Sequence, residues 1–172
     1  MKVEGNSDGI SIQIGAGTNT DAIRVISVGS GNELSIGSDC RIAGHFFLAH
    51  GAKLLIGDNL KCTSRILCHL HEGASVRIGN GCLFASEVSF RPTDAHKIFD
   101  LETGSRINAP QPITIGNNVW IGENALILKG ARIGDGSVVG ARSVVTSAFD
   151  KPNCLIAGQP AKLIREGVRW EP

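Results

Sequence analysis

The chain is built on a six-residue repeat. Its successive units are marked by Ile-Gly dipeptides that begin at residues 14, 36, 56, 78, 115 and 133. Three further positions belong to each repeat, namely two residues before the isoleucine and six and twelve residues after it. Seventeen of these eighteen residues are apolar, and Thr20 is the exception. Self-similarity of this kind predicts stacked, short β-strands that share one core.

The strands are too short to form a free-standing sheet. Alternation over a few residues places the apolar side chains on one face, and the small residues after each anchor permit a sharp corner. Three strands and three corners make one triangular coil that is stable only on its neighbours. We therefore predict an all-β parallel β-helix of about six coils. Its third core column is predicted to contain Ile26, Leu48, Cys68, Phe90, Ile127 and Val145.

The repeat covers nearly the whole chain, so we predict a single domain, residues 1–172. The coils span residues 10–150, an excursion loop spans 91–112, and a C-terminal cap spans 151–172. From Gln159, the sequence Pro-Ala-Lys-Leu-Ile-Arg-Glu-Gly predicts one short helix with Pro160 near its first turn. Such a helix would cover the open end of the solenoid.

Composition narrows the function. Lys and Arg number 17 and Asp and Glu 16, so the net charge of +1 provides neither a nucleic-acid footprint nor a polybasic membrane patch. No stretch is apolar enough to span a bilayer, and the first ten residues lack the apolar region of a signal peptide. Five cysteines without paired spacing indicate reduced thiols, and we expect a cytoplasmic protein. Four of them are predicted to point into the core: Cys40, Cys62, Cys68 and Cys82. Cys154 has no predicted role.

The repeat is interrupted once, by RPTDAHKIFDLETGSRINAPQP at residues 91–112. Phe90 and Ile115 are 25 residues apart, whereas the corresponding anchors of other coils are ten or fewer apart. Long loops on a rigid scaffold commonly carry function. This one contains a single histidine, His96, close to Asp94. Without further information, a functional histidine and an ordinary exposed one are equally good interpretations.

A family resemblance favours function. The segment ITIGNNVWIGENALILKGARIGDGSVVGARSVVT, followed by IAGQPAKLIR, resembles the sugar O-acetyltransferases among the hexapeptide-repeat acyltransferases. The spacing of 24 residues from His96 of TDAH to Trp120 of VWIG is similar to the polysaccharide and sialic-acid O-acetyltransferases in particular. The resemblance implies a left-handed β-helix, a homotrimer, and acetyl-CoA bound between adjacent subunits. Handedness does not follow from periodicity itself.

The resemblance also implies catalytic roles. His96 would remove the proton from a sugar hydroxyl as it attacks the thioester, without a covalent intermediate. Asp94 or a backbone carbonyl could hold the other ring nitrogen. Trp120, which alternation directs outward, would lie against the acetyl-thioester and the sugar. We therefore expect an acetyl-CoA-dependent O-acetyltransferase that modifies a carbohydrate acceptor in bacterial surface-polysaccharide synthesis.

Small and basic residues near the C-terminal coils are candidates for binding acetyl-CoA. Small residues would let the pantetheine arm lie against the backbone, and Lys or Arg would bind the phosphates. A solvated surface charge is the alternative for each basic residue. The candidates are Gly122, Lys129, Gly140, Ala141, Arg142, Ser143, Lys162 and Arg165.

Three other functions remain open at this point. The same fold could acetylate an amine of a sugar or an antibiotic. A carbonic-anhydrase-like enzyme would need three histidines around zinc, and His45 and His50 have a suitable spacing, but the TDAH loop and Trp120 have no place in it. We expect no metal, and the roles of His69 and His71 are also open. The third possibility is a non-catalytic scaffold, which would not bind acetyl-CoA.

Overall fold

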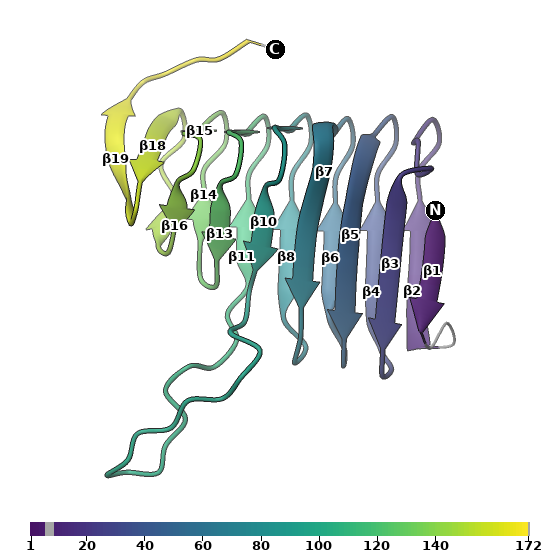
Figure 1. Cartoon of the computed structure of the whole chain (residues 1–172). Helices are drawn as coiled ribbons and strands as arrows, with labels where there is room; N and C mark the ends of the chain where they lie inside the picture. The colour runs from purple at the N-terminus through teal and green to yellow at the C-terminus, as the bar shows by residue number, and fades with distance from the viewer. Residues whose placement is uncertain (6–8, 172) are drawn as a thin grey trace.

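The computed structural model describes residues 1–5 and 9–171. The described residues form strands, turns and bends, and none of them forms a helix that could cross a membrane. The chain winds as a left-handed parallel β-helix of about six turns, drawn in Figure 1 as a prism of stacked strands. The β-helix predicted from the repeat is confirmed.

Two sheets make up the three faces of the prism. The seven-stranded sheet contains β2 (Ile10–Ile14), β4 (Asn32–Ile36), β6 (Lys53–Ile56), β8 (Ser75–Ile78), β11 (Ile113–Ile115), β14 (Arg132–Ile133) and β17 (Ala148–Phe149). The twelve-stranded sheet begins with β1 (Lys2–Gly5), β3 (Ile23–Val28), β5 (Arg41–Ala49) and β7 (Lys61–Leu70). It then divides into two rows. One row contains β9 (Leu83–Phe84), β12 (Trp120–Ile121), β15 (Val138–Val139), β18 (Cys154–Gly158) and β19 (Ala161–Glu166), and the other contains β10 (Ser89–Arg91), β13 (Leu126–Leu128) and β16 (Val144–Val145).

The register of the strands produces the predicted columns. The isoleucines of the six Ile-Gly dipeptides lie directly above one another in the seven-stranded sheet. A second column contains Cys62, Phe84, Ile121, Val139 and Ile156. Ile14 alone among the Ile-Gly isoleucines is largely exposed, at 39%, because β2 is the edge strand of its sheet. The core is therefore a stack of apolar layers, and its outermost layer is exposed because no further strand covers it.

The third column differs from its prediction in the first coils. Val25 and Phe46 lie in register with Cys68, whereas Ile26 pairs with Phe47 on the outer side and Leu48 pairs with Leu70. The register shifts because Arg41 is opposite Lys61 while Ala43 is opposite Arg65, so β7 contains two additional residues there. The anchors of the two earlier coils consequently lie closer to their Ile-Gly dipeptides than a fixed spacing of six allows.

The predicted C-terminal helix is wrong. Residues 161–166 form β19, which pairs antiparallel with β18 across a turn that contains the cis bond between Gln159 and Pro160. β18 continues the second core column by pairing with β15, and its other edge would be open without β19. A helix could not satisfy the N–H and C=O groups of that edge, and a strand does. The end of the solenoid is therefore capped by a hairpin.

The cysteines are part of the core. All five are free and buried, including the four predicted to point inward. Burial raises the pKa of the Cys62 thiol to about 12 and that of Cys82 to about 11. Cys154, for which the sequence provided no role, begins β18 and is 1% exposed. Thiols of this kind behave as small apolar groups.

Candidate active site

The interruption of the repeat is an ordered excursion from one corner of the prism. It leaves after β10 and returns into β11, and Ile113 pairs with Val76 of the preceding coil, so the core continues unbroken. The backbone N–H of Gln111 donates to the carbonyl oxygen of Pro92 at 3.1 Å and closes its base. Farther out, Ile107 donates to Ile98 at 3.0 Å. Figure 1 shows the excursion as two adjacent lengths of irregular chain that extend below the prism.

Asn108 holds the inner part of the excursion together. It is 5% exposed, and its side chain makes four hydrogen bonds within the excursion. The amide oxygen accepts from the backbone N–H of Ile98 at 2.7 Å and from the guanidinium of Arg106 at 3.4 Å. The amide nitrogen donates to the carbonyl oxygen of His96 at 2.7 Å and to the carboxylate of Asp94 at 2.9 Å. Asn108 thus fixes the backbone that carries His96, a role that no local sequence pattern signals.

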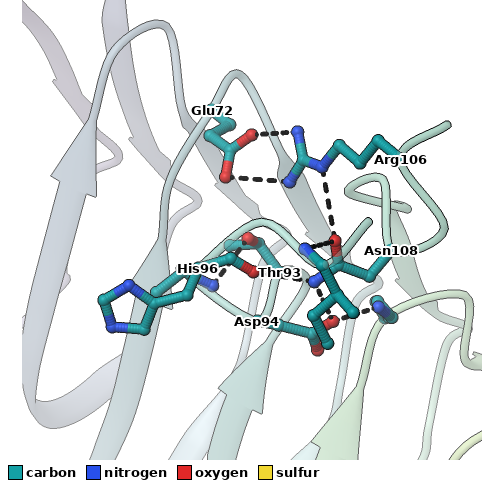
Figure 2. A network of polar contacts seen from close by, with 9 residues as sticks. Glu72, Thr93, Asp94, His96, Arg106 and Asn108 are labelled. Atoms are coloured by element: carbon teal, nitrogen blue, oxygen red, sulfur yellow. Dashed lines mark hydrogen bonds and ion pairs between the residues drawn. The ribbon is translucent and has the colours of Figure 1, made fainter. Parts of the chain in front are cut away.

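A bidentate ion pair attaches the excursion to the neighbouring coil. The guanidinium of Arg106 donates to the two carboxylate oxygens of Glu72 at 2.6 and 3.1 Å. Glu72 follows β7, so the contact joins segments 34 residues apart (Figure 2). The hydrogen bond from Arg106 lowers the pKa of the Glu72 carboxyl group. Both side chains are mostly covered, at 22% and 27% exposed, which gives this pair more weight than a fully solvated one.

Asp94 has different partners from those expected. Its carboxylate accepts from the ammonium group of Lys129, which follows β13, and from Asn108. Lys129 is the main cause of the lowered pKa of Asp94. No hydrogen bond connects Asp94 with the imidazole of His96 in the described part of the chain. In this chain, therefore, Asp94 anchors the excursion to the next coil and does not orient the ring.

The imidazole of His96 projects away from this network (Figure 2). The backbone N–H of His96 donates to the carbonyl oxygen of Asp94 at 2.7 Å, and Ala95 between them has a positive φ of 62°. The hydroxyl of Thr93 accepts from the N–H of Ala95 at 3.0 Å. This tight turn therefore fixes the backbone of His96, while its imidazole is exposed and has no hydrogen bond among the described residues.

Trp120 points outward from β12, as alternation predicts, and is 39% exposed. A second tryptophan, Trp170, lies beside it with 6.2 Å between ring centroids and 45° between ring planes. The indole N–H of Trp170 donates to the carbonyl oxygen of Asn118 at 2.8 Å. The segment after β19 therefore folds back over the strand that carries Trp120. Sequence reasoning missed Trp170, which is separated from Asn118 by 52 residues.

One chain does not bring His96 and Trp120 together. The excursion with His96 hangs below the lower edge of the prism in Figure 1, whereas β15 lies along its upper edge. Trp120 is in β12, which pairs directly with β15. The segments that carry the two residues therefore leave opposite edges of the prism.

Comparisons with known proteins place the chain in a family. The family model described as bacterial transferase hexapeptide (six repeats) matches residues 112–147. The polysialic acid O-acetyltransferase of Neisseria meningitidis is 34% identical over 183 aligned positions, covering 93% of this chain and 85% of the relative. That of Escherichia coli O1:K1 is 36% identical over 136, covering 78% of this chain and 43% of the relative. The crystal structure of the polysialic acid O-acetyltransferase OatWY superimposes with a TM-score of 0.76 at 31% identity, covering 99% of this chain and 90% of the other. The chain belongs to the hexapeptide-repeat acyltransferases.

Within that family it lies in the branch of the polysialic acid O-acetyltransferases and is an enzyme of the O-acetyltransferase class. Two of the small residues expected to admit the pantetheine arm of acetyl-CoA, Gly122 and Gly140, have structural roles in this acetyltransferase. A Cβ atom on Gly122 would lie 2.6 Å from the backbone nitrogen of Ala141, and one on Gly140 would lie 2.9 Å from the Cβ of Ala157. Both glycines are therefore required for the stacking of adjacent coils.

Some of the other candidates for acetyl-CoA binding have a polar partner within the chain, and others have no ion-pair partner among the described residues. Ser143 is buried, and its hydroxyl accepts from the N–H of Gly158 at 3.2 Å. Lys129 is paired with Asp94. Arg142 is exposed next to Ala141, while Lys162 and Arg165 are exposed on β19, and none of these three basic residues has an ion-pair partner among the described residues. These three candidates thus lie on the C-terminal hairpin or next to its turn, where the side chain of Gln159 donates to the carbonyl oxygen of Arg142.

The described residues contain no group of three or more His, Cys, Asp or Glu side chains that could hold a metal ion. His45 and His50, whose spacing suggested a zinc site, are both exposed, and Cys62 and Cys68 face the core away from His69.

Proposed function

We propose that this enzyme transfers an acetyl group from acetyl-CoA to a sugar hydroxyl of a bacterial surface polysaccharide, with His96 as the general base. Family membership supports the class of reaction, and the names of the relatives support a polysaccharide acceptor. The observation that carries the proposal is the free imidazole of His96 on a backbone fixed by Asn108 and by the turn at Ala95.

The chemistry needs only one proton-transfer group. The neutral imidazole accepts the hydroxyl proton as the sugar oxygen forms a bond to the thioester carbonyl carbon. The tetrahedral intermediate collapses with cleavage of the carbon–sulfur bond. The imidazolium then returns its proton to the departing thiolate, giving the acetyl ester and CoA thiol. A backbone N–H donor near Trp120 would stabilise the oxyanion.

We further propose that the active site forms between subunits of a homotrimer. The excursion that carries His96 leaves the lower edge of the prism, whereas β12, which carries Trp120, pairs with β15 at the upper edge, so a second copy would bring the two residues together. The excursion exposes large apolar side chains that a neighbouring subunit would cover. These are Ile98, Phe99, Leu101 and Ile107, with exposed fractions between 51% and 101%.

Acetyl-CoA would then lie along the corner formed by Gly122, Gly140 and Ala141. Its phosphates would be bound by Arg142, Lys162 and Arg165, the free cations around the hairpin. Lys129 would contribute only after separating from Asp94. Because acetyl-CoA is an intracellular metabolite, we expect the reaction to take place in the cytoplasm.

The test of catalysis is release of CoA thiol in the presence of acetyl-CoA and a panel of sugars. His96→Asn should lower the rate by at least about 100-fold, which is the range of general-base catalysis. His50→Asn is the matched control, because His50 is another exposed histidine and its positive φ of 56° suits asparagine. Full activity of His96→Asn would refute the assignment. Lability of the product to mild base distinguishes an ester from an amide.

The test of a shared site is complementation. Mixed trimers assembled from His96→Asn and Trp120→Ala chains would contain some sites with both native residues. We expect such mixtures to regain a fraction of the activity that each variant alone has lost. No recovery in confirmed mixed trimers would mean that each chain holds a complete site.

A further inference from the structure

The outer surface of β3, β5, β7 and β10 carries basic and aromatic side chains in rows. One row contains Arg24, His45, Leu67 and Ser89 in register. The adjacent row contains Ile26, Phe47 and His69, and Arg91 follows Ser89 at the end of β10. These strands lie side by side on the front of the prism in Figure 1, and the excursion begins directly below β10. The rows therefore lead from the first coils toward His96.

A depression of about 130 Å³ lies in this surface. Its lining consists of Arg24, Ile26, His45, Phe46, Phe47 and His69. Since one water occupies about 30 Å³, the depression has room for a substituent such as a carboxylate or an acylamino group, and not for a buried sugar ring. A ligand bound here would consequently lie on the surface and insert one group.

Aromatic rings form a platform beside the depression. The ring of Phe47 is 4.8 Å from that of His71, with 32° between the planes, and 6.1 Å from that of His69. Rings arranged in this way offer a flat apolar surface, against which the C–H face of a pyranose can pack while polar edges remain available.

Positive charge on this surface is only partly neutralised. Arg24 is paired with Glu4, but Arg91 has no ion-pair partner in the described part of the chain. Two strand arginines elsewhere, Arg65 and Arg132, are paired with Glu87 and Asp150. Burial and the nearby charge of Arg91 both lower the pKa of His69 and of His71, so Arg91 is the positive group on this surface that is charged at neutral pH and unpaired among the described residues.

We propose that Arg24, His45, Phe47, His69 and Arg91 form an acceptor face, a second subsite that binds a carboxylate-bearing polysaccharide several sugar units away from His96. The inference rests on the proposed function, because a polymer on this face leads to His96 only if His96 is the catalytic base. Arg91 binds a carboxylate of the polymer, Phe47 supports a sugar ring, and the depression receives one substituent.

The binding experiment uses the whole protein without acetyl-CoA. Binding of end-labelled polysialic acid is measured by fluorescence anisotropy at low salt. Arg91→Ala should weaken binding by about tenfold or more, the usual effect of losing a charge-assisted hydrogen bond. Arg91→Lys should retain part of the affinity. Arg77→Ala is the matched control, since Arg77 is exposed on β8 of the other sheet and has no ion-pair partner among the described residues. Equal affinities of Arg91→Ala and Arg77→Ala, or equal binding of neutral dextran of the same length, would overturn the proposal.

Transfer assays separate this inference from the proposed function. Phe47→Ala and His45→Ala should lower acetyl transfer to the polymer while leaving transfer to monomeric sialic acid within about twofold, because the lost contacts are remote from the reacting hydroxyl. Equal losses with both acceptors would argue against a second subsite. If no sugar is acetylated but polymer binding still depends on Arg91, the proposed function fails and the acceptor face is retained.

Discussion

The side-chain amide of Asn108 donates to the backbone carbonyl of His96 at 2.7 Å, across twelve residues of the excursion. This contact connects a buried, fully bonded side chain with an exposed imidazole. It explains how a long loop can hold the backbone of the proposed general base in a defined position. Precise positioning of this kind is what proximity effects in catalysis require.

Asn108→Ala should therefore reduce activity more than it reduces global stability. The substitution leaves the N–H of Ile98 and the carbonyl of His96 without their partner, at a local cost of about 1–3 kcal/mol. Because the excursion lies outside the stacked core, we expect increased hydrogen exchange in residues 93–108 and a nearly unchanged melting temperature of the coils. A fall in melting temperature without loss of turnover would contradict this role.

The two carboxylates that anchor the excursion predict its response to acid. Arg106 lowers the pKa of Glu72, and Lys129 lowers that of Asp94. A group whose pKa is lowered by folding stabilises the native state above its unfolded pKa, about 4, and this contribution is lost as the pH falls through the folded pKa. The excursion should thus loosen below about pH 4.

Hydrogen exchange measured between pH 3 and 6, corrected for intrinsic rates, tests this prediction. Excursion peptides should lose protection at a higher pH than peptides from β4 to β8. Glu72→Gln should show the loosened state already at neutral pH. Simultaneous loss of protection in the coils and in the excursion would contradict the local role of the two ion pairs.

Much of the scaffold could be predicted from the sequence because each coil repeats the same contacts. The isoleucine column follows from the Ile-Gly spacing alone, and the outward position of Trp120 follows from the burial of Ile121. The third column could not be read correctly, because two additional residues of β7 are hidden between anchors that remain apolar in either register. The C-terminal segment was predicted to be a helix. It is a strand because it pairs with the edge of β18, and that edge exists only once the coils have stacked.

The site was less accessible to sequence reasoning. The interruption and the family resemblance predict His96 as the catalytic base, and this stays a prediction. The residues that hold its backbone were missed, because Glu72 of a coil and Arg106 of the excursion are 34 residues apart and no local pattern marks the buried Asn108. Asp94 was named as one group that could hold the imidazole because the two residues are close in sequence. In the fold, Lys129 lies 35 residues farther on and takes the carboxylate instead.

The pair of Asp94 and Lys129 can be tested as one unit. Asp94→Asn and Lys129→Met should lower turnover to a similar extent, and the double variant should be little worse than either single variant. The pH dependence of kcat/KM in Asp94→Asn should keep the native apparent pKa, since the carboxylate does not contact the imidazole. Asp150→Asn serves as the control, because it disrupts the exposed ion pair with Arg132 of the seven-stranded sheet. A shifted apparent pKa in Asp94→Asn would restore the role of Asp94 in orienting the ring.

Trp120 and Trp170 are the two tryptophans of the chain, so intrinsic fluorescence reports on this pair alone. Trp170→Ala should shift the emission of Trp120 to the red and lower kcat/KM by a few fold, in line with about 0.5–1.5 kcal/mol for an aromatic pair. Trp170→Phe should retain most of the activity, because it keeps the ring contact and loses only the hydrogen bond to Asn118. Unchanged emission in Trp170→Ala would mean that the tail does not cover Trp120 in solution.

The acceptor face should bind an anionic polymer more tightly as the pH falls. Burial lowers the pKa of His69 and of His71, so both rings are mostly neutral at pH 7.5. The charges that influence His69 are those of Arg91, His71 and His45. The charges that influence His71 are those of Glu72, His50, Arg91 and His96. All of them except Glu72 favour the neutral form of the ring. A bound carboxylate reverses that balance by stabilising the imidazolium forms. Anisotropy titrations of labelled polysialic acid from pH 7.5 to 5.5 should show tightening affinity, and His69→Gln should show a smaller change. An affinity of the native protein that is independent of pH would exclude the histidines from the binding surface.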